Sequence, residues 1–214
     1  MIIKFKLGMC MRILPNIIRY TAVGAFVGTV SFCSIKTFAQ RELKSDLVEI
    51  RNKIPPEGTS DSIVLKNSPN PRFMCKGENK LAKFVVNLSN NVLYQYDADG
   101  KPVGAYLVAS GKPLTPTYEG YSVVSHVETF PYSRAPKFTK RRKNPRSYGP
   151  NIIILDKLNT ITGERSMTGQ FIHGNNDSTS LGQKVSMGCI RMNNKVIKYL
   201  SSIVNRGDYV IIKK

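Results

Sequence analysis

The segment from Phe171 to Asn194 contains the residue types of a cysteine nucleophile and its base. It holds His173, one of only two histidines in the 214-residue chain, and Cys189, one of four cysteines. A thiol with a pKa near 8.5 is only about 3% ionised at pH 7, so a cysteine nucleophile needs a base. An imidazole can take the thiol proton, and Gly188, just before the cysteine, lets the backbone approach a substrate carbonyl. The separation of 16 residues is too long for one helix face. It predicts a strand end with His173, a polar loop and a second turn with Cys189.

Both candidates also have a purely structural interpretation. Free cysteines are usually small buried hydrophobes, and His173 could be a buried structural histidine. The other histidine, His126, competes for the role of base. It lies in the strand-like pattern Val124–Val127 without a neighbouring glycine, so we expect it to be structural or to line a cleft. Two histidines and scattered cysteines without CxxC spacing make a poor zinc site.

The same segment closely resembles the signature of the L,D-transpeptidases of the YkuD type, cysteine enzymes that remodel bacterial peptidoglycan. The family's Ile-His-Gly and Ser-x-Gly-Cys-Ile-Arg-Met blocks correspond to Ile172–Gly174 and Ser186–Met192. Upstream, Ser110–Lys112 and Thr115–Thr117 resemble the family's Gly-Lys and Thr-Pro-Thr turn. Many members carry a second histidine where this chain has Met187, and its absence removes one donor near the oxyanion.

The resemblance implies the roles of the site residues. It makes Cys189 the nucleophile and His173 the base that takes the proton of the thiol. Some members have a serine after this histidine, whereas Gly174 offers only its backbone carbonyl. We therefore expect a Cys-His pair whose third member is the main chain.

The cysteine turn also supplies the candidates for oxyanion and substrate binding. The N–H groups of Gly188 and Cys189 are the expected oxyanion donors, because they adjoin the attacking sulfur. Ser186 and Gly174 are the other candidates in the same loop. Arg191 either holds a substrate carboxylate through its two-pronged donor set or braces the loop by hydrogen bonds to carbonyls.

The function that the resemblance implies is acyl transfer. The thiol attacks the bond between diaminopimelate and D-alanine in a tetrapeptide stem, D-alanine leaves, and the thioester passes to an amine. A second diaminopimelate gives a 3→3 cross-link, and an outer-membrane protein as acceptor becomes attached to the wall. Neither a metal nor an organic cofactor is required. The alternatives are a peptidoglycan carboxypeptidase or hydrolase on the same fold and a non-catalytic basic protein that docks on the wall or on nucleic acid.

The first 39 residues have the pattern of an export signal. They hold five basic residues and no acidic one, and an apolar run from Thr21 to Phe32 precedes the small residues of Thr37–Ala39. We expect cleavage after Ala39, with an uncleaved signal anchor over residues 13–35 as the alternative. Either reading places the enzyme in the periplasm, in contact with the membrane only through an uncleaved leader. We therefore expect no nucleic acid as a partner, in spite of the formal charge of +18.

Composition and the resemblance together divide the chain into three expected regions. Residues 1–39 are the leader, and residues 82–213 are the catalytic domain. Between them, residues 40–81 contain a short helix over 41–54 and an extended linker that begins at residue 57. Within the last region, short β-branched and aromatic runs alternate with turns, and one helical pattern spans 193–204. This predicts a mainly β fold, a mixed β-sandwich or barrel with one or two short helices. Removal of the leader leaves two cysteines, with Cys75 expected as a lone thiol in a loop rather than in a disulfide.

The densest charge run, Lys137–Arg146, falls where the family carries a variable lid. A solvated loop is the common outcome for such a run. We hypothesise that it steers the enzyme toward the anionic peptide stems of peptidoglycan, and that Lys140, Arg141, Arg142 and Lys143 carry the effect.

Overall fold

The structure is a computed structural model that describes residues 2–4, 10–14, 17–21, 54–55, 57–175 and 177–214. The chain divides into two units, residues 1–43 and 44–214. The first unit contains three antiparallel strands, β1 (Ile2–Lys4), β2 (Cys10–Leu14) and β3 (Ile17–Thr21), in that order. The predicted cleavage site and nearly all of the apolar run and the 41–54 helix lie outside the described residues. Within the described ranges, no helix is long and apolar enough to cross a bilayer.

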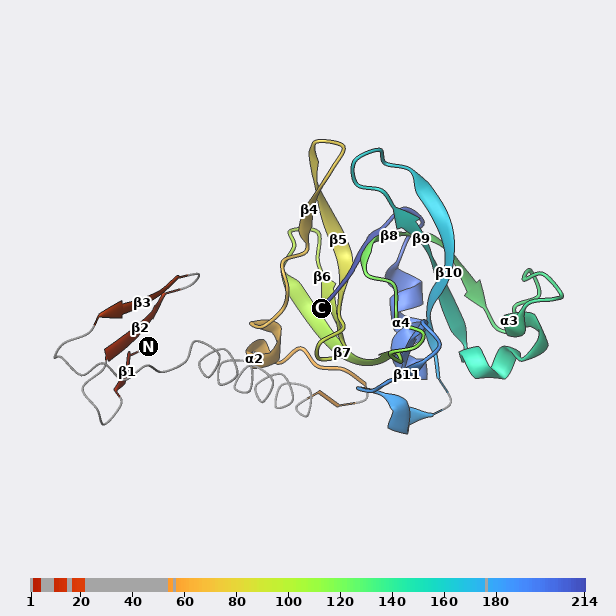
Figure 1. The fold of residues 1–214 in the computed structure, drawn as a ribbon. Coiled ribbons are helices and arrows are strands. Elements are labelled where there is room, and N and C mark those ends of the chain that lie inside the picture. Colours follow the sequence, from red (N-terminus) through yellow and green to blue (C-terminus); the bar gives the residue numbers. More distant parts are fainter. Residues whose placement is uncertain (1, 5–9, 15–16, 22–53, 56, 176) are drawn as a thin grey trace. The chain divides into compact units, whose positions relative to one another are not determined.

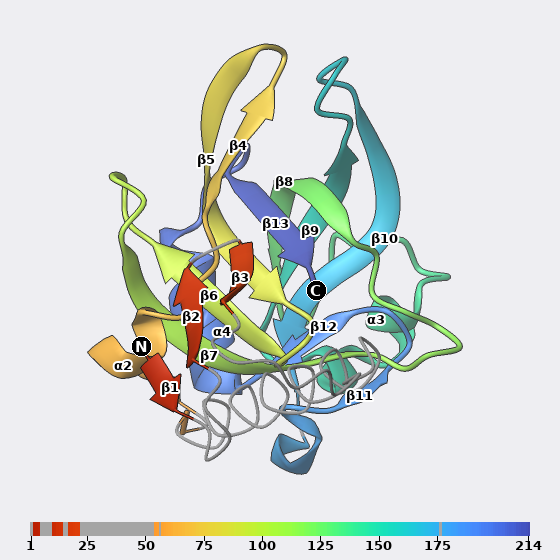
Figure 2. The ribbon, with the colours of Figure 1, turned by 60° about the vertical axis from the view of Figure 1, so that its left-hand side comes forward.

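The strands of the second unit form a closed ring. Pairing runs β5-β6-β7-β12-β10-β9-β8-β13 and returns from β13 to β5, while β4 extends the ring from β5 and β11 from β7 (Figures 1 and 2). The pairs β10/β12, β5/β13 and β7/β11 are parallel and the other pairs are antiparallel. The strands are β4 (Arg72–Cys75), β5 (Glu78–Asn87), β6 (Val92–Tyr96), β7 (Pro102–Gly111), β8 (Gly120–Thr129), β9 (Asn151–Leu158), β10 (Arg165–Gly174), β11 (Lys184–Ser186), β12 (Ile190–Met192) and β13 (Tyr209–Lys213). The prediction of a mainly β, barrel-like domain is confirmed.

The main core lies where the ring closes around α4 (Asn194–Ile203). Every ring strand contributes buried residues to this core, because alternate side chains of a strand point to opposite faces. In β5, for example, Phe84 and Val86 enter it while Val85 joins a second core on the other face. The helix adds Val196, Ile197 and Leu200, so the helical pattern predicted over 193–204 is confirmed.

The segment predicted to be an extended linker belongs largely to the folded unit. It contains α2 (Ser62–Leu65) and β4, and these bury Val64 and Phe73 in the second core. Cys75 is the last residue of β4 and is buried there as a free thiol, not exposed in a loop. The linker prediction was wrong because a few apolar residues are enough to fix a segment to the domain when each of them packs against the sheet.

Figure 2 shows the β4–β5 and β9–β10 hairpins rising beyond the ring on the same side.

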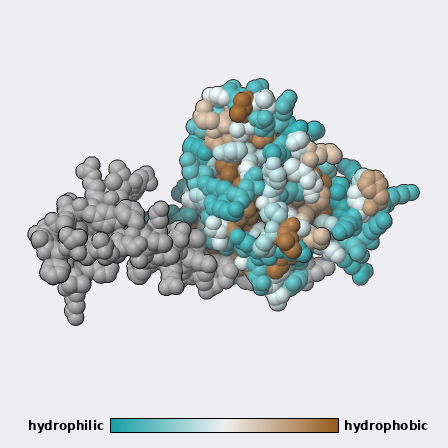
Figure 3. All heavy atoms as spheres, in the orientation of Figure 1, coloured by the Kyte–Doolittle hydropathy of each residue, from teal (hydrophilic) through white to brown (hydrophobic). Residues whose placement is uncertain are grey.

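The segment 130–149, which we call the lid, joins β8 to β9 and contains α3 (Lys140–Lys143) and the 3-10 turn η1 (Pro145–Tyr148). It packs on the outer faces of β9 and β10. Tyr132 and Ala135 meet Ile152 and Ile154 in a third, small core. The face of the second unit seen in Figure 3 is mostly polar, with scattered apolar side chains.

Candidate active site

The register of β10 and β12 places the two candidate catalytic side chains on one face of the sheet. The parallel pair aligns Ile172 with Ile190, and both of these side chains are fully buried in the main core. Cys189 lies one residue before Ile190 and His173 one residue after Ile172. Because side chains alternate, both point to the opposite face, the one that the lid covers. The predicted arrangement of strand end, loop and second turn is what the structure shows.

His173 is held as a neutral imidazole with a defined tautomer. Only 3% of the residue is exposed, and its Nδ1 lies 2.6 Å from the carbonyl oxygen of Gly174. A carbonyl can only accept, so Nδ1 carries the hydrogen and the lone pair of the neutral ring is on Nε2. Burial lowers the pKa of His173 to about 4; the charge of Arg191 lowers it further, and the backbone carbonyls of Gly174 and Tyr148 oppose the shift. The backbone carbonyl of Gly174 thus orients the imidazole, as expected for a main-chain third member.

Cys189 is a thiol, not a thiolate, in the free protein. Burial raises the pKa of Cys189 above its ordinary value, although the backbone N–H of Phe171 and the charge of Arg191 act in the opposite direction. A neutral thiol that shares a sheet face with a neutral imidazole is suited to general-base catalysis, in which the proton moves during attack. It is not the preformed thiolate–imidazolium pair of other cysteine enzymes.

Ser186 organises the loop that carries Cys189, the candidate nucleophile. Its side chain is fully buried; the hydroxyl donates to the carbonyl of Cys189 at 2.5 Å and accepts from the N–H of Gly188 at 3.1 Å. Gly188 has φ +109°, a conformation that other residues rarely adopt. The N–H of Gly188 is therefore already engaged, which corrects its predicted role as an oxyanion donor. The N–H of Cys189 makes no hydrogen bond within the described residues and is the remaining backbone candidate.

The Gly-Lys and Thr-Pro-Thr turn supports this loop from the side. The N–H of Lys112 and the hydroxyl of Thr115 both donate to the carbonyl of Ser186, at 3.0 and 3.3 Å. Gly111 donates from its N–H to the hydroxyl of Thr117 at 2.8 Å, and a Cβ at Gly111 would lie 2.5 Å from the nitrogen of Thr117. The motif therefore positions the cysteine turn by close backbone packing.

Tyr148, at the end of the lid, was not among the residues predicted for the site. Its ring centroid lies 4.8 Å from that of His173 with a tilt of 48°. Burial raises the pKa of the Tyr148 phenol, and the nearby Cys189 raises it further. The lid thus places an aromatic ring beside the candidate pair, His173 and Cys189. No spacing in the sequence indicated this contact. Tyr148 belongs to the lid, and its position depends on how the lid folds back over the sheet.

A buried ion pair fixes the lid to the sheet. Arg141 donates to both carboxylate oxygens of Glu128, at 2.8 and 3.2 Å, and the Glu128 side chain is only 8% exposed. The Arg141 guanidinium also lies 5.3 Å from the ring centroid of Phe171, the residue whose N–H faces the thiol. Arg141 is therefore an anchor, which corrects its inclusion among the residues that would steer substrate.

The second histidine, His126, lies outside the candidate pair of His173 and Cys189. The ring of His126 is half-exposed, and its Nε2 lies 3.3 Å from Glu128. Its place beside the lid anchor agrees with a structural or cleft-lining residue. Among the described residues, no three His, Cys, Asp or Glu side chains come together as a possible metal site.

Arg191 faces the site from β12. Its Cα is aligned with that of His173 on one side and with that of Ala109 on the other. In the part of the chain that the structure describes, its guanidinium makes no hydrogen bond or ion pair. The bracing role considered above is thus not observed, and the charge is available to a ligand.

Comparison with known proteins identifies the family. The family model for YkuD, the L,D-transpeptidase catalytic domain, matches residues 82–212, and the chain belongs to this family. A relative named YkuD from Bacillus licheniformis is 32% identical over 131 residues, which are 61% of this chain and 64% of the relative. YqjB from Bacillus subtilis strain 168 is 35% identical over 140 residues, or 64% of this chain and 75% of the relative. The chain thus spans slightly less than two thirds of the Bacillus licheniformis relative.

Two solved structures show similar but distant chains. An L,D-transpeptidase from Mycobacterium tuberculosis H37Rv has 19% identity and a TM-score of 0.47, over 61% of this chain and 57% of that one. The catalytic domain of an Enterococcus faecium L,D-transpeptidase has 26% identity and a TM-score of 0.42, over 61% of this chain and 95% of that one. The family assignment rests on the sequence match.

Proposed function

We propose that this protein is a peptidoglycan L,D-transpeptidase that uses Cys189 as nucleophile and His173 as general base. The observation that carries the proposal is the neutral imidazole of His173, whose Nδ1 is bound to the carbonyl of Gly174 on the sheet face that Cys189 shares. Nε2 is then the only ring nitrogen able to accept a proton. Membership of the L,D-transpeptidase family supports the same chemistry.

The first half-reaction forms a thioester. Sγ of Cys189 attacks the carbonyl between diaminopimelate and D-alanine while Nε2 of His173 takes the thiol proton. The N–H of Cys189 donates to the developing oxyanion, and the charge of Arg191 attracts a carboxylate of the stem. When the tetrahedral intermediate collapses, His173 returns the proton to the leaving amine, and D-alanine departs with the C–N bond broken.

The second half-reaction regenerates the enzyme. An amine attacks the thioester carbonyl, His173 takes a proton from that amine, and the sulfur leaves and is reprotonated by the imidazolium. A diaminopimelate side chain as acceptor gives a 3→3 cross-link, and an amine of an outer-membrane protein gives attachment to the wall. Water as acceptor gives a carboxypeptidase. Burial of both groups keeps the pair neutral until a substrate is bound, which protects the thiol between turnovers.

The proposed setting is the periplasm. The basic, acid-free first 39 residues and the small residues before position 40 support export, with residues 13–35 as an anchor if cleavage does not occur. Peptidoglycan stems are then the substrates within reach.

The full chain incubated with disaccharide-tetrapeptide tests the proposal, with products weighed by mass spectrometry. A dimer lighter by one D-alanine supports transfer, and disaccharide-tripeptide alone supports hydrolysis. Cys189→Ala should abolish both products and also the covalent adduct with a carbapenem, whereas His126→Gln, the matched control, should retain them. A wild-type chain that binds stems without changing their mass would instead be a non-catalytic wall-binding protein.

A further inference from the structure

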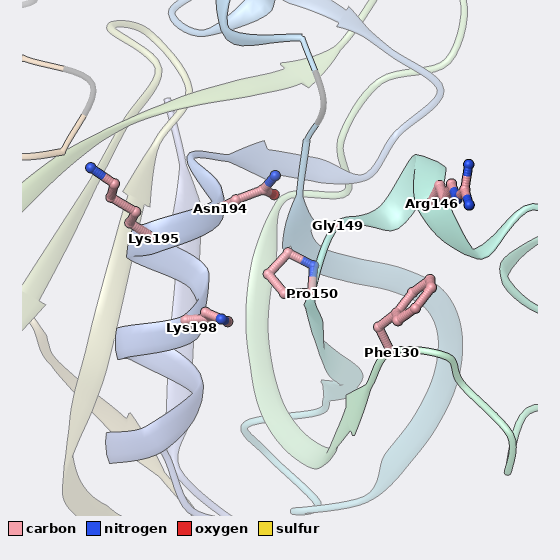
Figure 4. A pocket seen from close by; sticks show the side chains of 7 residues that line it. All are labelled: Phe130, Arg146, Gly149, Pro150, Asn194, Lys195 and Lys198. Carbon is pink, nitrogen blue, oxygen red and sulfur yellow. The ribbon is translucent and has the colours of Figure 1, made fainter.

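Residues 174–188, which we call the connecting segment, lead from the base to the nucleophile and are fixed to the fold at both ends. At the start of the segment, the N–H of Asn175 donates to Oδ1 of Asn194 at 2.9 Å. In the cavity between the lid and α4 that Figure 4 shows, Asn194 extends from the start of α4 toward Gly149. A Cβ at Gly149 would lie only 2.6 Å from the Cα of Gly174, so the lid packs tightly against the end of β10. These contacts fix the backbone that orients the imidazole.

The far end of the connecting segment is fixed to β7 and to the turn before β6. The N–H of Gly182 donates to the carbonyl of Val108 at 2.9 Å. The carbonyl of Gln183 accepts from the N–H of Ser110 at 3.0 Å. The side chain of Asn91 adds a further bond, because its Nδ2 donates to the carbonyl of Gly182 at 2.9 Å. These bonds hold the segment just before it enters β11.

Asn91 has the backbone conformation and the surroundings that this contact requires. Its φ is +54°, a left-handed conformation that asparagine adopts more readily than most residues. The residue is buried, and its Oδ1 accepts from the hydroxyl of Ser110 at 2.7 Å. The carbonyl of Gly182 can only accept, so the nitrogen of the amide faces it and the oxygen faces Ser110. The amide is thus held in a single orientation by bonds at both its oxygen and its nitrogen.

This network reaches the nucleophile through β11. Ser110 is aligned with Lys184 in the parallel pair of β7 and β11. Ser186 is the last residue of β11, and its hydroxyl donates to the carbonyl of Cys189 at 2.5 Å. Because separate contacts fix the start of the connecting segment, a displacement at its far end changes the distance between the sulfur and the imidazole.

We propose that Asn91 and Ser110 are positioning residues, which hold Cys189 in place relative to His173. They act through the path of the connecting segment rather than by contact with the substrate. This role rests on the proposed function, because a fixed separation matters to the rate only if the imidazole takes the thiol proton. Such a step depends steeply on geometry, and a misplacement of about 1 Å can slow it about 100-fold.

The test removes the amide of Asn91 and leaves the turn intact. Asn91→Gly introduces a residue that tolerates a φ of +54°. The matched control is Asn90→Gly, because Asn90 is equally buried but donates to Tyr94 and not to the connecting segment. Acylation of Cys189 in the full chain by a carbapenem is followed by intact mass over a range of drug concentrations. Asn91→Gly should lower the maximal rate about 10-fold to 100-fold and leave the half-saturating concentration unchanged, and Asn90→Gly should keep the wild-type rate.

A double-mutant cycle with His173→Gln separates positioning from a general weakening of the fold. Where the base is already missing, Asn91→Gly should slow acylation little further, so the two losses should be far from additive. Ser110→Ala should also slow acylation when His173 is present, and Ser110→Thr, which keeps the hydroxyl, should restore the rate. A loss by the same factor with and without His173, or a wild-type rate in Asn91→Gly, would overturn the positioning role.

Failure of the proposed function would give a different result. A wild-type chain that is not acylated on Cys189, or a His173→Gln chain that is acylated as fast as the wild type, would overturn the general-base mechanism itself. Circular dichroism at the assay temperature shows whether each variant is folded. If Asn91→Gly is unfolded, the two Ser110 variants decide. A wild-type rate in Ser110→Ala, or a loss that Ser110→Thr does not restore, would overturn the positioning role.

Discussion

Protonation of His173 should make the folded protein unusually sensitive to mild acid. The unfolded chain binds this proton near the ordinary pKa of 6.5, whereas burial lowers the pKa of the folded imidazole to about 4. Between these values the unfolded state binds more protons than the folded state, so stability falls as the pH falls. The contribution is fully present above pH 6.5 and is lost progressively toward pH 4. Integrated over that interval, it amounts to about 3 kcal/mol.

The substitution that isolates this effect is His173→Gln, which keeps a donor for the carbonyl of Gly174 but cannot be protonated. Guanidinium unfolding at pH 7, 5 and 4 can be followed by tyrosine fluorescence, because the chain has ten tyrosines and no tryptophan. Between pH 7 and pH 4 the wild type should lose about 3 kcal/mol more unfolding free energy than the variant. The carboxylates, common to both chains, cancel in the comparison.

His126→Gln serves as the control, because the ring of His126 is half-exposed. Its unfolding free energy should depend on pH as that of the wild type does. Parallel pH curves for the wild type and His173→Gln would refute the reasoning, because they would mean that the imidazole is protonated equally easily in both states. The neutral base on which the mechanism depends would then be absent.

Three further predictions concern the nucleophile, its loop and the lid. Iodoacetamide should alkylate Cys189 slowly at pH 7, and the rate should still rise above pH 9. Buried Cys75 should react only on unfolding. A plateau of the Cys189 rate below pH 8 would indicate a preformed thiolate and contradict this prediction. Ser186→Ala should cost about 1–3 kcal/mol in thermal or denaturant unfolding and slow carbapenem acylation, since the carbonyl of Cys189 loses its donor; wild-type values for both would contradict the bracing role. Glu128→Gln should lower the free energy of unfolding by about 3 kcal/mol, because it leaves the charge of Arg141 unpaired. In a double-mutant cycle with Arg141→Gln, the losses of unfolding free energy from the two substitutions should be far from additive. Additive losses would mean that Glu128 and Arg141 do not act as a pair.

The steering hypothesis now needs a different set of substitutions. Arg141 is an anchor, so its replacement would disturb the lid and confuse the result. Lys140→Gln/Arg142→Gln/Lys143→Gln removes three charges of the same run and leaves the ion pair intact. Binding of intact sacculi by this variant should weaken at low salt and differ little from the wild type at high salt. Equal binding at low salt would refute the hypothesis.

Much of the site could be predicted from the sequence because its residues lie close together along the chain. Cys189, His173 and Ser186 fall within one stretch of strand, loop and strand, and the order of these elements fixes the face on which each side chain lies. The helix that became α4 was predictable for the same reason, since its apolar spacing is local. The mainly β class followed from the short β-branched runs.

Long-range contacts set the limit of that prediction. The occupation of the Gly188 N–H by Ser186 depends on a turn geometry that composition does not specify. The contact of Tyr148 with His173 and the ion pair of Arg141 with Glu128 depend on how the lid folds back over β9 and β10. A basic run looks the same in the sequence whether one of its members is buried or all of them are solvated. The packing of α2 and β4 was missed because two or three apolar residues in a polar stretch do not form a periodic pattern.

Capture of the acyl-enzyme tests the central claim most directly. The full chain is mixed with disaccharide-tetrapeptide, quenched in acid at short times and weighed intact, and the modified residue is located by digestion. The account predicts a thioester on Cys189 that carries the stem without its D-alanine, and formation about 10²–10⁴-fold slower in His173→Gln. An adduct on another residue, or a rate in His173→Gln equal to that of the wild type, would contradict it.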